Sequence, residues 1–451
     1  MFDTATSPYK LFTNRQLVKL IVPLVIEQAL AMLIGMADTV MVTSISESAV
    51  SAVSLVDNMN LLLIQLFSAM AAGGAIVVAQ YLGKGDKAAA GSSSKQLVHV
   101  TLLISLVIAA AAIVFCDPLL VLCFGQLSEG TMDYCRTYLY LSALSFPALA
   151  VYNGCAAVLR AMRNSRASMT TSILMNLINV GGNALLIYGF QMEVAGAGIA
   201  SLVARTAGAV VMARMLLKPN LPVELVEPLR IRLDVGMIKR IFKLGIPNGV
   251  ENSMFQVGRL MVLGMVSPLG ETIIAANAVS NTIATAANLM GTAMNLAVVT
   301  VIGQCVGAGD EKQTRYYARK LMTVLYLFNA VIYALLFVYT TPITKLFNLS
   351  PEAVQASVEV LRWFAAVSFV LWPTSFMLPC VLRAAGDVRY TLCVSMSTMW
   401  LCRILSSYVM VNMLGMGLMG VWLGMLIDWL GRSVFVVPRY LGKKWLTKRV
   451  V

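Results

Sequence analysis

Charged side chains interrupt the long apolar runs of this sequence, and they are the groups best suited to chemistry there. A charge at the centre of a membrane-spanning helix costs about 2.5–3.5 kcal/mol on insertion scales. Such a side chain therefore faces a hydrated cavity, pairs with an opposite charge or is neutralised, and it often marks an ion or substrate pathway. The charged residues within the apolar runs are Glu27, Asp38, Asp57, Arg205, Glu251, Arg259, Arg403 and Asp428.

Two of these acids have simple structural interpretations. Asp428 and Arg432 are one helical turn apart, so we expect them to form an ion pair. Asp57 lies nearer the outer end of its predicted helix, where water can solvate it. Neither acid is therefore our first choice for a binding site.

Asp38 is the strongest candidate for an ion-binding group. On the fifth apolar run, Asn176, Asn179 and Asn183 are spaced i, i+3 and i+7, which places them on one helical face. Amide side chains can donate hydrogen bonds to a carboxylate, or offer carbonyl oxygens to a bound cation. We therefore interpret these residues with Asp38 as a site for a coupling ion, either H⁺ or Na⁺. The alternative is that the asparagines bond one helix to another.

No pattern typical of an enzyme or of a resident cofactor is present. The eight cysteines form no C-x-x-C pair and His99 is the sole histidine, so a zinc site is not expected. The phosphate loop, the H-E-x-x-H motif and the nucleophile elbow are all missing. We therefore predict a protein that is not an enzyme and that needs no cofactor.

The elements that must position Asp38 are membrane-spanning helices. The chain has 451 residues, of which 59% are hydrophobic and 12% charged, whereas a soluble protein carries about 25% charged residues. We therefore predict an all-α integral membrane fold of twelve transmembrane helices. The apolar runs lie at 17–45, 47–81, 93–116, 131–156, 167–190, 196–217, 237–266, 271–306, 316–341, 352–380, 390–413 and 417–438.

The two halves of the chain repeat at one nearly constant displacement. The corresponding pairs include Pro23 and Pro247, Glu27 and Glu251, and Gln80 and Gln304. Each half has six apolar runs, an even number, so both halves enter the membrane from the same side as a parallel pseudo-two-fold repeat. We predict an N-lobe at 1–218, a cytoplasmic linker at 219–236 and a C-lobe at 237–451. Asp38 has no acidic counterpart, because the repeat aligns it with Val262.

Charge predicts the orientation of the chain. The formal net charge is +13, and basic residues gather in alternate loops and in the tail after the last apolar run. By the positive-inside rule both termini are cytoplasmic and the protein lies in the plasma membrane as a multi-pass protein. The basic charge therefore indicates contact with the lipid bilayer and not with nucleic acid. The sequence gives no sign of an obligatory protein partner.

Two prolines are expected to bend the helices that contain them. Pro23 and Pro247 lie inside long apolar runs, where a proline removes a backbone hydrogen bond and kinks the helix. Together with Gly35, Pro23 could let the outer part of the first helix, including Asp38, bend relative to the rest. A static kink is the alternative.

These features together resemble the multidrug and toxic compound extrusion (MATE) family over nearly the whole chain. The resemblance rests on the motifs L-x-x-P-x-x-x-E at 20–27, Ala-Asp-Thr at 37–39, Q-Y-L-G-x-G-D at 80–86, V-L-R-A at 158–161 and N-x-x-N at 176–179, and on the repeat of Pro247 and Glu251. It implies cation-coupled efflux of organic, often cationic, drugs through a V-shaped cavity between two six-helix lobes.

The resemblance also implies roles for single residues. The family's N-lobe carboxylate corresponds to Asp38, its fifth-span asparagine to Asn179, and the seventh-span acid of one branch to Glu251. Glu27 is a further candidate from the repeat, because an acid shared by both halves could serve as a fold or gating device. Several members carry a second aspartate where this chain has Asn183. A sodium site here would then hold one formal negative charge, which favours H⁺ as the coupling ion.

Two other functions compete with drug antiport. A flippase for lipid-linked precursors, from the same superfamily, would place several basic residues in the central cavity to bind pyrophosphate. Only Arg205, Arg259 and Arg403 are available, and the acids are at least as numerous. A scaffold or receptor would explain neither the repeat nor the acids. We therefore predict an antiporter, with a small organic molecule as its substrate.

Overall fold

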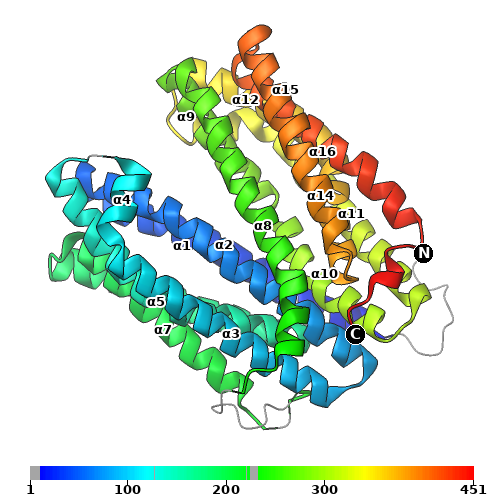
Figure 1. Ribbon diagram of the computed structural model, residues 1–451. Helices are drawn as coiled ribbons and strands as arrows, with labels where there is room; N and C mark the ends of the chain where they lie inside the picture. Colours follow the sequence, from blue (N-terminus) through cyan, green and yellow to red (C-terminus); the bar gives the residue numbers. More distant parts are fainter. Residues whose placement is uncertain (1–10, 126, 220, 224–231) are drawn as a thin grey trace. The chain divides into compact units, whose positions relative to one another are not determined.

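The computed structural model describes residues 11–125, 127–219, 221–223 and 232–451, and no strand occurs among them. The helices of the first half follow one another along the chain (Figure 1). They are α1 (Asn14–Thr43), α2 (Glu47–Lys84), α3 (Lys87–Val114), α4 (Cys116–Phe124), α5 (Glu129–Ala161), α6 (Ser165–Asn183), the π-helical turn η1 (Ala184–Gly189) and α7 (Glu193–Leu216).

The second half has more interruptions within its helices. Its elements are α8 (Val235–Val266), η2 (Ser267–Leu269), α9 (Glu271–Ala287), α10 (Leu289–Gly307), α11 (Glu311–Lys345), α12 (Pro351–Trp372), η3 (Pro373–Met377), α13 (Leu378–Ala384), α14 (Val388–Thr398), η4 (Met399–Ile404), α15 (Leu405–Tyr408), η5 (Val409–Met413), α16 (Gly417–Leu441) and η6 (Leu446–Lys448). Of these, η3, η4 and η5 are π-helical turns. The predicted all-α fold is confirmed for the described residues.

Eleven helical segments of the described chain are long and apolar enough to cross a membrane. They overlap every predicted run except 237–266, which forms the 32-residue helix α8. With a rise of about 1.5 Å per residue, a helix of this length can span a bilayer. Helix α8 carries Glu251 and Arg259 inside its length, and these charges lower its apolar character below that of the other spans.

The repeat is visible in the turns that end two helices. Gly85 follows α2 with φ +83°, and Gly309 follows α10 with φ +71°. A positive φ of this size favours glycine, because it has no Cβ to clash with the backbone. The two glycines are separated by the same interval as Pro23 and Pro247, so the two halves end these helices in the same way. After the second turn, the Asp310 side chain accepts a hydrogen bond from Gln313 N at 2.9 Å and begins α11.

The chain divides into two compact units. Unit 1 contains the described parts of Met1–Val25, Ala79–Asp86 and Met261–Val451, and unit 2 contains those of Ile26–Val78 and Lys87–Leu260. Helices α1, α2 and α8 are therefore each divided between the units. The predicted lobes at 1–218 and 237–451 follow the sequence repeat instead and remain a prediction. Residues 220 and 224–231 of the predicted linker lie outside the described residues.

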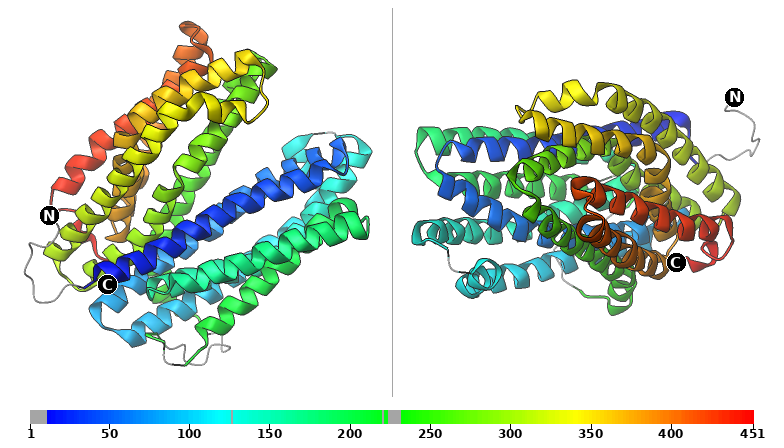
Figure 2. Two further views of the ribbon diagram at one scale, coloured as in Figure 1. Left: turned by 180° about the vertical axis from the view of Figure 1, so that it is seen from behind. Right: turned by 90° about the horizontal axis from the view of Figure 1, so that it is seen from above.

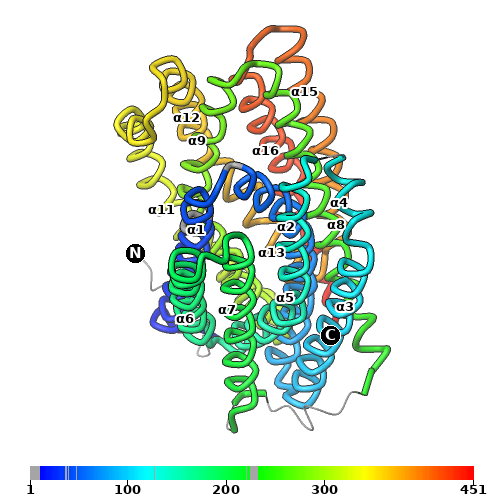
Figure 3. Tube along the Cα trace, turned by 90° about the vertical axis from the view of Figure 1, so that its left-hand side faces the viewer, coloured from blue at the N-terminus to red at the C-terminus, as the bar shows by residue number. Residues whose placement is uncertain are grey.

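Each unit is a helical bundle with its own apolar core. In unit 2, α5 packs against α7 and α3, and α6 packs against α7 (Figures 2 and 3). In unit 1, α12 packs against α11, α9 and α16. There the ring of Phe364 makes edge contacts with Tyr333, Trp422 and Trp429 at centroid distances of 5.5–5.9 Å. Such buried aromatic contacts fix the helices relative to one another within the unit.

The outer helix faces carry exposed apolar side chains. Leu103, Leu106 and Val107 on α3 and Val331 and Leu335 on α11 are examples. A soluble protein rarely exposes large contiguous apolar patches. These faces therefore fit contact with lipid.

Candidate ion-coupling site

Asp38 contacts the fifth-run asparagines inside unit 2. Asn183 Nδ2 donates a hydrogen bond to Asp38 Oδ1 at 2.6 Å, and Asn183 is fully buried. Asp38 is half-buried, and no described lysine or arginine forms an ion pair with it. The carboxylate is therefore held by an amide and has no direct counter-charge.

The other two asparagines lie progressively further from Asp38. Asn179 Nδ2 donates to Ser201 Oγ on α7 at 3.1 Å, and Asn179 Oδ1 lies 3.5 Å from Asn183 Nδ2. Asn176 Nδ2 donates to the carbonyl oxygen of Ser172 in its own helix at 2.7 Å. The described contacts therefore bring Asn183 directly to Asp38 and Asn179 next to Asn183, whereas Asn176 bonds to its own backbone.

One polar atom at this point has no partner. Asn183 Oδ1 is buried and makes no hydrogen bond to any described group. A buried acceptor without a donor costs about 1–3 kcal/mol, so such an atom usually meets water or an ion. Helix α6 ends at Asn183 and continues as the π-helical turn η1. Turns of this kind are frequent at functional sites.

A second group of polar side chains, around Asp57, lies close to Asp38 and was not predicted from the sequence. Tyr138 Oη on α5 donates to Asp57 Oδ1 on α2 at 3.1 Å, so Asp57 is bound by protein and not only by water. Asn60 Nδ2, one turn along α2, donates to Ser142 Oγ at 3.1 Å. Asn60 Oδ1 is buried without a described partner.

Arg205 completes this polar interior. Its Nη1 donates to Ser145 Oγ at 2.6 Å. Tyr138, Ser142 and Ser145 are spaced i, i+4 and i+7 on α5, and this spacing is the sequence signal that could have revealed the group. The N-site, as we call it, consists of Asp38, Asp57, Asn60, Tyr138, Ser142, Ser145, Asn179, Asn183, Ser201 and Arg205.

Glu27 is held by an ion pair and a hydrogen bond elsewhere in unit 2. Arg160 Nη1 donates to Glu27 Oε1 at 3.0 Å, and Ser168 Oγ donates to Oε2 at 2.6 Å. Glu27 is therefore a buried ion-pair partner that joins α1, α5 and α6. Its repeat counterpart Glu251 is half-buried on α8, four residues after Pro247. Pro23 and Pro247 lie inside α1 and α8, as predicted.

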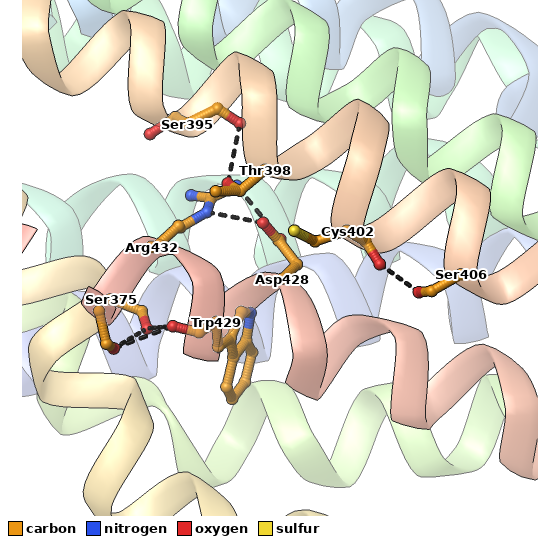
Figure 4. A network of polar contacts seen from close by, with 9 residues as sticks. Ser375, Ser395, Thr398, Cys402, Ser406, Asp428, Trp429 and Arg432 are labelled. Atoms are coloured by element: carbon orange, nitrogen blue, oxygen red, sulfur yellow. Dashed lines mark hydrogen bonds and ion pairs between the residues drawn. The ribbon is translucent and has the colours of Figure 1, made fainter. Parts of the chain in front are cut away.

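Unit 1 also holds a buried acid in a spanning helix, Asp428. Arg432 Nε donates to Asp428 Oδ1 at 3.0 Å and Nη2 donates to Oδ2 at 3.3 Å, which confirms the predicted pair (Figure 4). Ser375 Oγ donates to the carbonyl of Trp429 at 2.6 Å beside it. Among the described residues, no group of three or more His, Cys, Asp or Glu side chains is arranged to hold a metal ion.

The chain is similar over most of its length to known transporters. A probable multidrug resistance protein NorM of Thermotoga maritima is 24% identical over 453 residues, covering 97% of this chain and 94% of the relative. The Bacillus subtilis transporter YisQ is 26% identical, with 94% of each chain covered.

Solved structures show the same fold. A MATE crystal structure in complex with MaL6 superposes with a TM-score of 0.89 at 18% identity, covering 96% of this chain and 97% of the other. An outward-facing multidrug resistance MATE transporter of the MOP superfamily gives 0.87 at 19% identity, covering 96% of both chains.

The family model MatE matches the chain twice, at residues 23–185 and 247–409. The second match begins and ends at the same displacement from the first that separates Pro23 from Pro247, which confirms the predicted repeat. The chain therefore belongs to the MatE family, the multidrug and toxic compound extrusion transporters.

Proposed function

We propose that the protein is a cation-coupled antiporter that exports small organic, often cationic, molecules across the plasma membrane by alternating access. Membership of the family supports efflux in general. The observation that carries the coupling is the half-buried Asp38, which is held by Asn183 and has no ion-pair partner among the described residues. A carboxylate of this kind can gain and lose a cation during transport, whereas a paired carboxylate is already neutralised.

The free energy released when one coupling ion enters the cell limits the transport that this ion can drive. A membrane potential of 100 mV supplies about 2.3 kcal/mol for each inward charge, and a tenfold gradient adds about 1.4 kcal/mol. Exporting one monovalent organic cation for one inward ion cancels the voltage contribution. Only the chemical gradient then remains, so H⁺ and Na⁺ are equally able to drive transport on energetic grounds alone.

The test is drug efflux from proteoliposomes that contain the full chain and the fluorescent organic cation ethidium. Asp38→Asn keeps the size of the side chain but removes its charge, so gradient-driven efflux should be lost. Asp133→Asn is the matched control, because Asp133 is exposed on α5 beside Arg136. Efflux that persists in Asp38→Asn at an equal amount of reconstituted protein would refute the role of Asp38.

Glu251 provides a graded comparison within the same assay. If the N-site binds the coupling ion, Glu251→Gln should impair efflux less than Asp38→Asn does. The reverse order would place the coupling ion in the second half of the chain instead.

The proposed orientation has both termini in the cytoplasm. Lys443 follows α16 and Glu129 begins α5, and both are exposed. A cysteine at 443 should react with an impermeant thiol reagent only from the cytoplasmic side, and a cysteine at 129 only from outside. Labelling with the opposite sidedness would invert the topology.

A further inference from the structure

A groove opens on the surface of unit 1 between α11 and α12. Its volume is about 480 Å³, within the range of roughly 300–1,000 Å³ that is typical of ligand sites. The side chains that line it come from the end of α11 and the start of α12, among them Thr341, Pro351, Gln355, Glu359, Arg362 and Trp363. None of these residues belongs to the N-site or to the buried ion pairs.

Helix α11 bends beside this groove. Tyr339 has non-helical torsions, with φ −98° and ψ 16°, and Pro342 lies within the helix shortly after it. A proline inside a helix removes a backbone hydrogen bond and bends the helix. Thr341, which lines the groove, lies between these two residues. The groove therefore lies at a bend of the backbone.

The polar side chains of the groove share one face of α12. Gln355, Glu359 and Arg362 are spaced i, i+4 and i+7, and Trp363 follows one turn after Glu359. All four are exposed, and no described group forms an ion pair or a hydrogen bond with their side chains. A carboxylate and a guanidinium therefore line the same groove without being paired, although their i, i+3 spacing allows a contact.

These side chains lie at the depth of lipid headgroups. The span Pro351–Ala384 has 34 residues, or about 51 Å at 1.5 Å per residue, whereas the hydrocarbon core is about 30 Å thick. With the excess shared between both ends, about 10 Å, or roughly seven residues, lies outside the hydrocarbon at each end. Glu359 is then at the boundary, and Arg362 can extend its guanidinium to it. Trp363 fits this level, because tryptophan is enriched at membrane interfaces.

Apolar side chains continue the same face towards the middle of the span. Phe369 is spaced i+7 from Arg362 and Val370 is spaced i+7 from Trp363, and they are 40% and 45% exposed. On α11, Val338 is 66% exposed and lies one turn before the residue that lines the groove. A molecule bound here has its charged part against the polar residues of α12 and its apolar part along both helices. A phospholipid has this composition.

We propose that the groove between α11 and α12 binds the headgroup of phosphatidylethanolamine, with Arg362 at its phosphate and Glu359 at its ammonium group. A guanidinium donates hydrogen bonds in a planar fork that fits phosphate oxygens. An ammonium group carries three N–H donors, for which the Glu359 carboxylate and the Gln355 amide oxygen are acceptors. The one anion and one cation of the headgroup match the one cation and one anion of the groove.

The charges of the groove also distinguish the phospholipid classes. Phosphatidylglycerol has a phosphate but no cation, so Glu359 stays unpaired beside an anionic headgroup. Phosphatidylcholine carries a quaternary ammonium, which has no N–H group to donate and is recognised by cages of aromatic rings. Among the described residues, Trp363 is the one aromatic side chain that lines this groove. Phosphatidylethanolamine is therefore expected to bind more tightly than the other two lipids.

The test is native mass spectrometry of the purified full chain after incubation in detergent with equal amounts of the three phospholipids. The wild type should retain phosphatidylethanolamine at least about fivefold over each of the others, a difference of about 1 kcal/mol. Glu359→Gln should lose the preference for phosphatidylethanolamine over phosphatidylcholine, and Arg362→Gln should retain less of all three. Glu352→Gln is the matched control, because Glu352 is exposed in the first turn of α12 and does not line the groove.

A further variant should change the preference of the groove. Glu359→Lys places two cations beside each other, so this variant should retain phosphatidylglycerol over phosphatidylethanolamine. A folding defect does not explain such a result, because a lost groove retains none of the three lipids.

Two results would overturn the proposal. The first is equal retention of the three lipids by the wild type. The second is an unchanged preference for phosphatidylethanolamine in Glu359→Gln and Glu359→Lys. Either result would mean that lipid covers α11 and α12 without recognition of its headgroup, and neither would affect the proposed antiport.

Discussion

The buried acids of the two units differ in how their charge is balanced. In unit 1, Asp428 is 0% exposed and receives two hydrogen bonds from Arg432, which is 3% exposed. In unit 2, Asp38 is half-buried and receives its bond from the amide of Asn183. The first carboxylate is fully paired and inaccessible, whereas the second keeps a charge that an incoming cation can neutralise.

The same contrast occurs within one helix. Glu27 and Asp38 both lie on α1, but Glu27 is bound by Arg160 and Ser168. An acid in a membrane-spanning helix therefore does not by itself indicate an ion site. The two acids differ in their partners: an arginine binds Glu27, whereas an amide binds Asp38 and leaves its carboxylate without a counter-charge among the described residues.

The largest expected effect is on the pair in unit 1. Arg432→Met leaves Asp428 charged and without its partner in a site that excludes water, so the free energy of unfolding should fall by about 3–5 kcal/mol. Thermal unfolding of the purified protein in detergent measures this loss. Asp38→Asn, in contrast, should leave the unfolding temperature close to that of the wild type.

The double variant Asp428→Leu/Arg432→Met is the control for this prediction. Removing both charges should recover most of the lost stability, because replacing a buried ion pair by apolar side chains is often nearly neutral. If Arg432→Met alone were as stable as the wild type, the pair would not be structural, and the contrast with Asp38 would fail.

A smaller loss is expected at the first-helix pair. Glu27→Gln keeps the shape of the side chain but removes the charge that Arg160 and Ser168 bind, which should cost about 1.5–3 kcal/mol of unfolding free energy. Ser168→Ala, which removes the neutral donor, should cost less. An equal effect of Glu27→Gln and Asp38→Asn on stability would mean that the two acids of α1 are not distinguished by their partners.

The sequence was sufficient to predict the spans, the repeat and the contact between Asp38 and the face of Asn183. It was not sufficient to exclude Asn176, which shares that face but lies two helical turns before Asn183. With a rise of about 5.4 Å per turn, the two asparagines are roughly 10 Å apart along the helix axis, too far for contact with the same carboxylate. Helical periodicity shows on which face of a helix a side chain lies. It does not show the level along the helix axis at which the partner of that side chain lies.

Other features depend on tertiary packing that the sequence does not reveal. Tyr138 looks like an ordinary core aromatic until the rotation of α5 places it against Asp57. Residues 11–25, which include the start of α1, belong to the unit that contains most of the second half. There Tyr317 Oη accepts from Phe12 N at 3.0 Å and donates to Phe12 O at 2.6 Å. A repeat aligns residues in the sequence but does not say which segments pack together.

The smallest effect on stability is expected at Gly35, and it tests whether Asp38 moves. Gly35 lies three residues before Asp38 in the interior of α1, and an added Cβ would meet no described atom within 4 Å. Alanine is about 1 kcal/mol more favourable than glycine within a helix, so Gly35→Ala should keep or slightly raise the unfolding temperature. The matched control is Gly73→Ala, whose Cβ would lie 2.6 Å from the backbone nitrogen of Gly245 and should destabilise the protein.

A comparison of Gly35→Ala with Gly73→Ala therefore distinguishes an effect on stability from an effect on the bending of α1. If α1 bends near Gly35 to carry Asp38 between its loaded and unloaded states, the stiffer Gly35→Ala helix should slow ethidium efflux several-fold without any loss of unfolding temperature. Efflux at the wild-type rate would show that α1 does not bend at this position. Asp38 would then exchange its ion within a rigid helix, and any bending would have to occur at Pro23, where the helix lacks a backbone hydrogen bond.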